Sequence, residues 1–154
     1  MGRTLERVGD TWSLMILRDA LHGLTRVDQF EKSLGVAPNI LTQRLGALVE
    51  AGFLERRPYQ DRPVRHDYVL TDRGRDFGPV LTALMAFGNR QFAVEGVASF
   101  MADAETGEAA DPIVVDRKTG RPIDEHYVYT AGPAAGPDVL ARVGQVQARR
   151  RAML

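Results

Sequence analysis

One short segment carries side chains that can hydrogen-bond the edges of nucleic-acid bases. The amides of Asn39 and Gln43 can pair with adenine N6 and N7. The hydroxyl of Thr42 can bond a base or a phosphate, and Arg44 can reach a guanine edge or a phosphate. Any surface helix can display such residues. Whether these residues contact bases therefore depends on the secondary-structure elements that carry them.

Arginine is concentrated a little further along the chain, at Arg56, Arg57, Arg62 and Arg65. On a hairpin, such residues can follow a phosphate backbone or enter a minor groove. The alternative is a solvated charged hairpin, in which some of these arginines pair with neighbouring carboxylates. The formal net charge is zero and acidic residues gather after residue 102, so the basic character is local.

Apolar spacing predicts the helices that position the first of these segments. It predicts one mostly buried helix over 5–21 and a short second helix over 27–34, with Thr25 as its N-cap. A third helix begins near Ala37, with Pro38 in its first turn, and ends at Gly52. Two short helices joined by a tight turn form a helix-turn-helix, whose second helix enters the major groove.

The arginines fall on a predicted β-hairpin, formed by residues 53–57 and 65–70 around a turn. A long amphipathic helix follows, capped by Thr71 and Asp72 and reaching Phe92 or Ala93. The predicted fold class is mainly α with a β-hairpin wing, a winged helix-turn-helix. This domain is predicted to span residues 1–94 and to carry both DNA binding and dimerisation.

Residues 95–154 are expected to form a C-terminal extension whose role the sequence does not give. A small hairpin is predicted from residues 113–115 and 126–129, around a turn at 118–120. A helix is predicted from Asp138 toward the basic run 149–151.

Composition argues against several other classes of protein. The chain has no cysteine, and its three histidines lack ligand-like spacing, so we expect no metal site and no cofactor. No nucleophile or nucleotide-binding motif is present, which argues against an enzyme. No apolar run approaches the roughly 18 residues of a membrane span, and the start lacks a signal-peptide block. We therefore expect a cytoplasmic protein with no membrane partner.

Several ordered motifs together resemble the HxlR-type bacterial transcriptional regulators. The resemblance covers roughly residues 4–92 and rests on the run from Val8 to Asp19, on 37–45 and 52–57, on 68–71 and on Gly74. Such an ordered set is more specific than any single motif.

The resemblance implies a winged helix-turn-helix that controls transcription as a homodimer, often in response to a small molecule or an electrophile. It assigns base and phosphate contacts to Pro38, Asn39, Thr42, Gln43 and Arg44, and it assigns the wing to residues 56–65. This chain departs from the family at several points, one of them the conservative change to Phe87-Gly88 where members often have Trp-Gly. It lacks the cysteine that some members use for redox sensing, and it has Gly46 where many members carry a basic residue.

A homodimer is also expected from geometry, because one recognition helix covers only half of an operator. The residues proposed for the dimer surface are large and apolar: Trp12, Met15, Leu84, Phe87 and Phe92. Some of them can fill the monomer core instead. The expected partners are double-stranded operator DNA, a second copy of the chain and a small-molecule effector. The alternative is a winged-helix module that binds a protein or a ligand and reads no DNA; the arginine-rich wing favours DNA.

Overall fold

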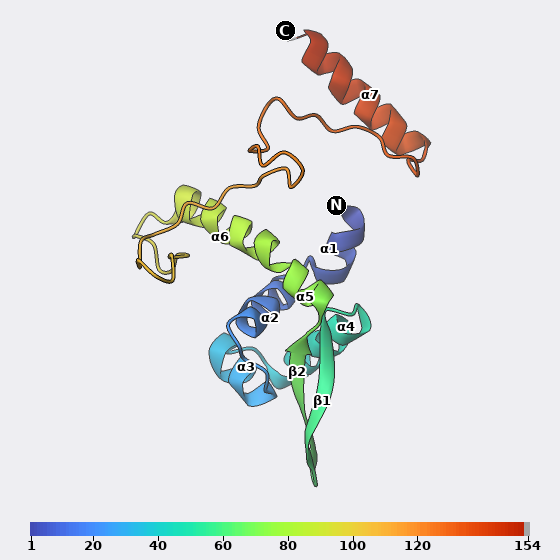
Figure 1. Ribbon diagram of the computed structural model, residues 1–154. Coiled ribbons are helices and arrows are strands. Elements are labelled where there is room, and N and C mark those ends of the chain that lie inside the picture. The colour runs from blue at the N-terminus through green and yellow to red at the C-terminus, as the bar shows by residue number, and fades with distance from the viewer. Residues whose placement is uncertain (153–154) are drawn as a thin grey trace. The chain divides into compact units, whose positions relative to one another are not determined.

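The first apolar stretch forms two helices, α1 (Gly2–Val8) and α2 (Thr11–Leu21), in the computed structural model, which describes residues 1–152 (Figure 1). The prediction of one continuous helix is wrong. The break has a local cause, because the backbone N–H of Gly9 closes α1 on the carbonyl of Leu5 at 2.8 Å. Asp10 then caps α2 by accepting from Ser13 N at 3.0 Å.

Helices α3 (Val27–Leu34) and α4 (Pro38–Glu50) form the predicted helix-turn-helix. Gly35 joins them at φ +59°, a left-handed conformation that glycine adopts without steric cost. The predicted cap of α3 is wrong. Arg26 is the N-cap residue, and the side-chain oxygen of Gln29 accepts from the backbone N–H groups of Thr25 and Arg26 at 3.0 Å each.

The core lies where α2, α3 and α4 meet the base of the wing. Its largest fully buried apolar side chains are Phe30, Ile16, Leu17, Leu41, Leu45, Leu48, Leu54 and Val8. In α4 the buried leucines recur at positions 41, 45 and 48, which is the spacing of one helix face. The opposite face of α4 is therefore left to solvent.

The wing consists of β1 (Leu54–Asp61) and β2 (Val64–Leu70), which pair antiparallel and extend away from the helices (Figure 1). Leu54 lies opposite Leu70 at the buried base. A register shift between Pro58 and Gln60 leaves Tyr59 unpaired. The predicted hairpin is confirmed, and its strands reach further toward the turn than the sequence pattern indicated.

Two helices follow the wing, α5 (Asp72–Asp76) and α6 (Gly78–Phe92), where the sequence predicted one. Thr71 caps α5 as predicted, accepting from Gly74 N at 3.2 Å. The break falls at Phe77, two residues before Pro79. Proline has no N–H to donate to the preceding turn, so a new helix starts there with Pro79 in its first turn.

The chain forms two compact units, residues 1–112 and the residues from Ile113 onward. The second unit contains α7 (Pro137–Ala152), which confirms the predicted C-terminal helix. The predicted hairpin is reduced to a turn, with a single bridge between Val115 and Pro122, and residues 126–129 form no strand. The functional division predicted at residues 94 and 95 stays a prediction. Among the helices described, none is long and apolar enough to cross a membrane.

Two turns near this boundary share the pattern Asp-x-x-Thr-Gly, at 103–107 and 116–120. In each, the aspartate accepts backbone N–H groups of its own turn and the glycine has φ near +70°. These bonds hold the pKa of Asp103 and of Asp116 below its usual value. Sequence reasoning missed this short repeat.

Candidate nucleic-acid interface

The solvent face of α4 carries the polar side chains predicted to contact bases. Pro38, Asn39, Thr42 and Gln43 are all exposed, while the leucines of the opposite face are buried. The hydroxyl of Thr42 donates to the carbonyl of Pro38 at 2.8 Å, so its oxygen remains an acceptor. Asn39 and Gln43 are four residues apart, which sets their amides side by side along one face.

Arg44 lies beside this row and is held by a contact that the sequence did not indicate. Its Nε is 3.3 Å from Oδ1 of Asp10, and both side chains are about one-third exposed, at 35% and 32%. The Nε atom itself is buried. The structure therefore ties the recognition helix to the N-terminus of α2 through a partly buried ion pair.

Asp10 is the capping residue of α2 as well as the partner of Arg44. Its carboxylate accepts from the backbone N–H of Ser13 at 3.0 Å and from the hydroxyl of Ser13 at 2.6 Å. Burial opposes ionisation of Asp10, but the two bonds from Ser13 and the Arg44 charge outweigh it, so the pKa of Asp10 lies below its usual value. The folded protein therefore favours the ionised carboxylate of Asp10.

We expect Asp10→Asn to remove the part of the stability that depends on this charge. Asparagine caps helices about as well as aspartate, so the capping bond from the backbone N–H of Ser13 remains. Because the folded pKa is lower than the unfolded value, the contribution is present above about pH 3.9 and is lost as pH falls through the folded pKa. At neutral pH the loss should be roughly 0.5 kcal/mol, typical of a partly exposed pair.

Urea unfolding of both proteins between pH 2 and pH 7 checks this prediction. Other carboxylates titrate equally in the two proteins and cancel in the difference. A difference in unfolding free energy that is as large at pH 2 as at pH 7 would contradict a charge effect.

The four predicted arginines of the wing are exposed, but they do not share one face. Arg56 lies opposite Tyr68 in the strand pairing, and Arg57 lies opposite Asp67. Because successive side chains of a strand point to opposite faces, these two arginines diverge. Arg57 also pairs with Glu55, with its Nε 2.8 Å from Oε1.

The other two arginines flank the tip of the wing, with Arg62 in the turn and Arg65 on β2. Among the residues that the structure describes, no ion pair involves Arg56, Arg62 or Arg65. These three exposed cations, unlike Arg57, are therefore not held by a carboxylate in the described part of the chain.

Contacts from the start of α3 set the direction of the wing. The hydroxyl of Thr25 donates to Asp67 at 2.8 Å, and Arg26 lies 3.7 Å from the same carboxylate. The guanidinium of Arg26 also covers the ring of Tyr59, 4.5 Å from its centroid. Sequence reasoning missed Arg26 and Asp67, because only the folded chain brings them together.

A second surface is apolar and lies on α6. Leu84 and Phe87 are each 51% exposed and Phe92 is 72% exposed, so the side chains predicted for the dimer surface are available there. Val80, missed in the sequence, lies on the same helix face, one turn before Leu84. Trp12 and Met15 of α2 are only partly buried, and Trp12 packs against the core.

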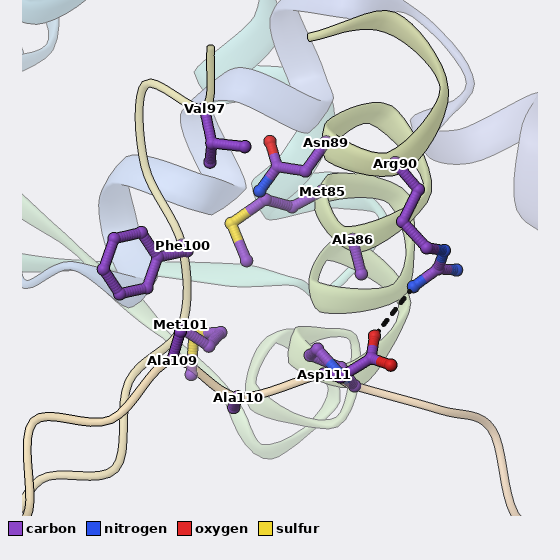
Figure 2. A pocket seen from close by; sticks show the side chains of 11 residues that line it. Met85, Ala86, Asn89, Arg90, Val97, Phe100, Met101, Ala109, Ala110 and Asp111 are labelled. Carbon is purple, nitrogen blue, oxygen red and sulfur yellow. Dashed lines mark hydrogen bonds and ion pairs between the residues drawn. The ribbon is translucent and has the colours of Figure 1, made fainter.

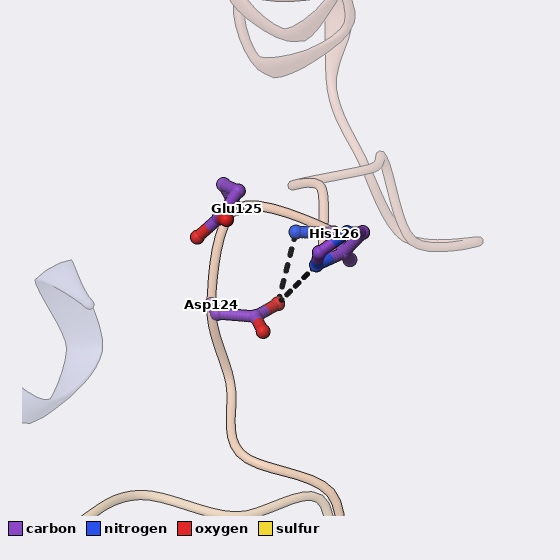
Figure 3. Close-up of side chains that lie close together, drawn as sticks. All are labelled: Asp124, Glu125 and His126. Carbon is purple, nitrogen blue, oxygen red and sulfur yellow. Dashed lines mark hydrogen bonds and ion pairs between the residues drawn. The ribbon is translucent and has the colours of Figure 1, made fainter.

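Asp124, Glu125 and His126 of the second unit bring potential ligand atoms within 4.8 Å of one another (Figure 3). All three are exposed. Asp124 accepts from the backbone N–H of His126 at 2.9 Å and contacts its Nδ1 at 3.1 Å. The backbone bond from His126 lowers the pKa of Asp124 below its usual value. These bonds within one turn account for the arrangement.

Comparisons with known proteins agree with this architecture. A sequence model of the HxlR-like helix-turn-helix family matches residues 7–95. An uncharacterised HTH-type transcriptional regulator of Mycobacterium tuberculosis, Rv3095, is 37% identical over 144 residues, which are 93% of this chain and 89% of the relative.

Solved structures show the same similarity. The candidate transcription factor PA1374 of Pseudomonas aeruginosa is 47% identical, with a TM-score of 0.67 over 91% of this chain and 97% of its own. The redox regulator HypR in its reduced form is 26% identical, with a TM-score of 0.55 over 58% of this chain and 92% of its own. The chain belongs to the HxlR-like helix-turn-helix family, whose curated relatives are named HTH-type transcriptional regulators.

Proposed function

We propose that this protein regulates transcription by binding specific double-stranded DNA as a homodimer. The observation that carries the proposal is the exposed polar face of α4, backed by buried leucines and followed by an arginine-bearing wing. A helix anchored in this way can enter a major groove without losing its core contacts. DNA of the cell's own genome is the expected partner, which implies action in the cytoplasm.

We assign base reading to Asn39 and Gln43, whose exposed amides can each form two hydrogen bonds with adenine. Thr42 and Pro38 lie beside them and would contact bases or the backbone. The wing would bind phosphates through Arg56, Arg62 and Arg65, with Arg57 shared between Glu55 and DNA. Arg44 would contact a phosphate with its terminal nitrogens while Asp10 orients it.

The proposed dimer uses the apolar face of α6. Paired half-sites lie about 34–36 Å apart on one side of the duplex, so two recognition helices related by a two-fold axis are needed. The exposed side chains of Val80, Leu84 and Phe87 would otherwise remain in water, and neighbouring exposed apolar side chains of this kind often mark an interaction surface.

We also propose that a small molecule modulates binding. One structural relative is a redox regulator, but these 154 residues contain no cysteine, so no thiol among them can act as a sensor. Reversible binding of a small molecule needs no thiol and is the response that we propose.

The test is binding of the full chain to a fluorescent duplex from its own upstream region and to a random duplex, over a series of salt concentrations. Gln43→Ala should reduce the preference for the operator about tenfold or more, because a bidentate base contact is lost. Gln145→Ala, an exposed glutamine of α7, is the matched control and should leave the preference unchanged.

Arg56→Ala should weaken binding to both duplexes alike and make the salt dependence shallower by about one unit of slope. Equal binding of the wild type to operator and random DNA would overturn sequence-specific recognition. The function would then pass to the protein-binding or ligand-binding alternative.

A further inference from the structure

A hollow of about 270 Å³ lies between α6 and the chain that follows it (Figure 2). One wall is the second half of α6, and the others are residues 97–101 and 109–112. Its lining is mostly apolar and includes Met85, Ala86, Val97, Phe100 and Met101. The whole hollow belongs to the first compact unit of the chain.

The hollow is separate from the part of the proposed dimer surface that Val80, Leu84 and Phe87 form; Phe92 lies at nearly the same helix angle as Met85 and is not part of that face. At 100° per residue, Met85 and Asn89 point away from the face that carries Val80, Leu84 and Phe87. A second copy of the chain packed on that face would therefore leave the hollow open.

The polar groups around the hollow restrict what it can bind. Arg90 and Asp111 form an ion pair at 3.2 Å on its rim, so these charges compensate each other and favour an uncharged ligand (Figure 2). The side-chain amide of Asn89 donates to the carbonyl of Ser99 at 2.8 Å, which fixes its orientation. Its oxygen accepts no hydrogen bond from the residues that the structure describes, so it is free to accept one from a ligand that can donate.

We propose that this hollow is the effector site of the protein, and that it binds a small, uncharged, mainly aromatic molecule with one hydroxyl or amine donor. The aromatic body would pack against the two methionine thioethers and Phe100, contacts that sulfur makes favourably with rings. The donor would bond the oxygen of Asn89. The volume lies just below the roughly 300–1,000 Å³ of pockets for drug-sized molecules, so the ligand has one or two rings.

This inference rests on the proposed response to a small molecule. The ligand would join residues 97–112 to α6, the helix that also carries the proposed dimer face. The test is made without DNA, so its failure would leave sequence-specific binding untouched. Conversely, if the protein binds the ligand but no specific DNA, the proposed ligand site stands and only the proposed role in transcription is refuted.

Naphthol is a suitable probe, titrated into the full chain and followed by its own fluorescence and by calorimetry. We expect saturable binding of one molecule per chain. Methoxynaphthalene, which has the same rings without a donor, should bind about five- to tenfold more weakly, as expected for one lost hydrogen bond. Ala110→Leu should weaken naphthol binding at least tenfold, because its exposed side chain would fill the hollow.

Ala104→Leu is the matched control, since Ala104 is exposed on the same segment but does not line the hollow. It should bind naphthol as the wild type does, and circular dichroism would establish that both variants fold. Two results would overturn the site: no saturable binding by the wild type, or unchanged binding by Ala110→Leu. If Leu84→Ala abolished naphthol binding and Ala110→Leu did not, the probe would bind at the dimer face. That result would also overturn the site.

Discussion

Gly74→Ala is expected to lower the free energy of unfolding by about 3 kcal/mol, the upper range for overpacking, and the melting temperature by roughly 10 °C. A Cβ at this position would lie 2.3 Å from the carbonyl oxygen of Phe53 and 2.7 Å from a methyl group of Leu70. The carbonyl cannot move freely, because it accepts the backbone N–H of Thr71 at 3.0 Å. The added methyl group must therefore push α5 away from the base of the wing.

Gly46→Ala is the control that separates this clash from the general effect of replacing glycine in a helix. A Cβ at Gly46 has no heavy atom within 4 Å, and the residue lies inside α4. Its replacement should stabilise the protein by about 0.5–1 kcal/mol, because alanine favours the helix. Thermal and urea unfolding of both variants would test the pair. Equal stability of the two variants would show that the chain around Gly74 adjusts without cost.

Most of the elements near the recognition helix were predictable because their signals are local. Gly35 and Pro38 mark the turn and the start of α4, and the leucine spacing identifies its buried face. The helix breaks were missed because apolar spacing continues across them. At Gly9 and Asp10 the local signal was a glycine followed by a capping residue, and before Pro79 it was the proline itself. Each signal was outweighed by the hydrophobic period around it.

The exposed amides of the site could be predicted, but the environment of its charges could not. Arg44 is one-third exposed in an ion pair with Asp10, which is 34 residues away in the chain. No periodicity links two such positions. The same holds for Arg26 and Asp67, which direct the wing, and for the hollow beside α6. Sequence patterns report on one element at a time, whereas these features arise where two elements meet.

Leu84→Glu is expected to convert the proposed dimer to a monomer and to lower operator affinity by at least a hundredfold. Leu84 is half-exposed in the chain by itself, so glutamate there leaves the monomer core unchanged. In a two-fold dimer the same position would be covered, and an unpaired carboxylate would lose its water, which costs several kcal/mol. Each monomer would then bind a single half-site, without the gain in affinity from linking two.

Sedimentation and DNA titration at matched protein concentrations would measure both effects. Gln145→Glu is the control, because it adds the same charge at an exposed position of α7, outside the apolar face of α6. That variant should stay dimeric and bind the operator as the wild type does. A Leu84→Glu protein that sediments as a dimer would place the interface elsewhere. A monomer that keeps full operator affinity would show instead that recognition does not need two copies, which would contradict the half-site argument itself.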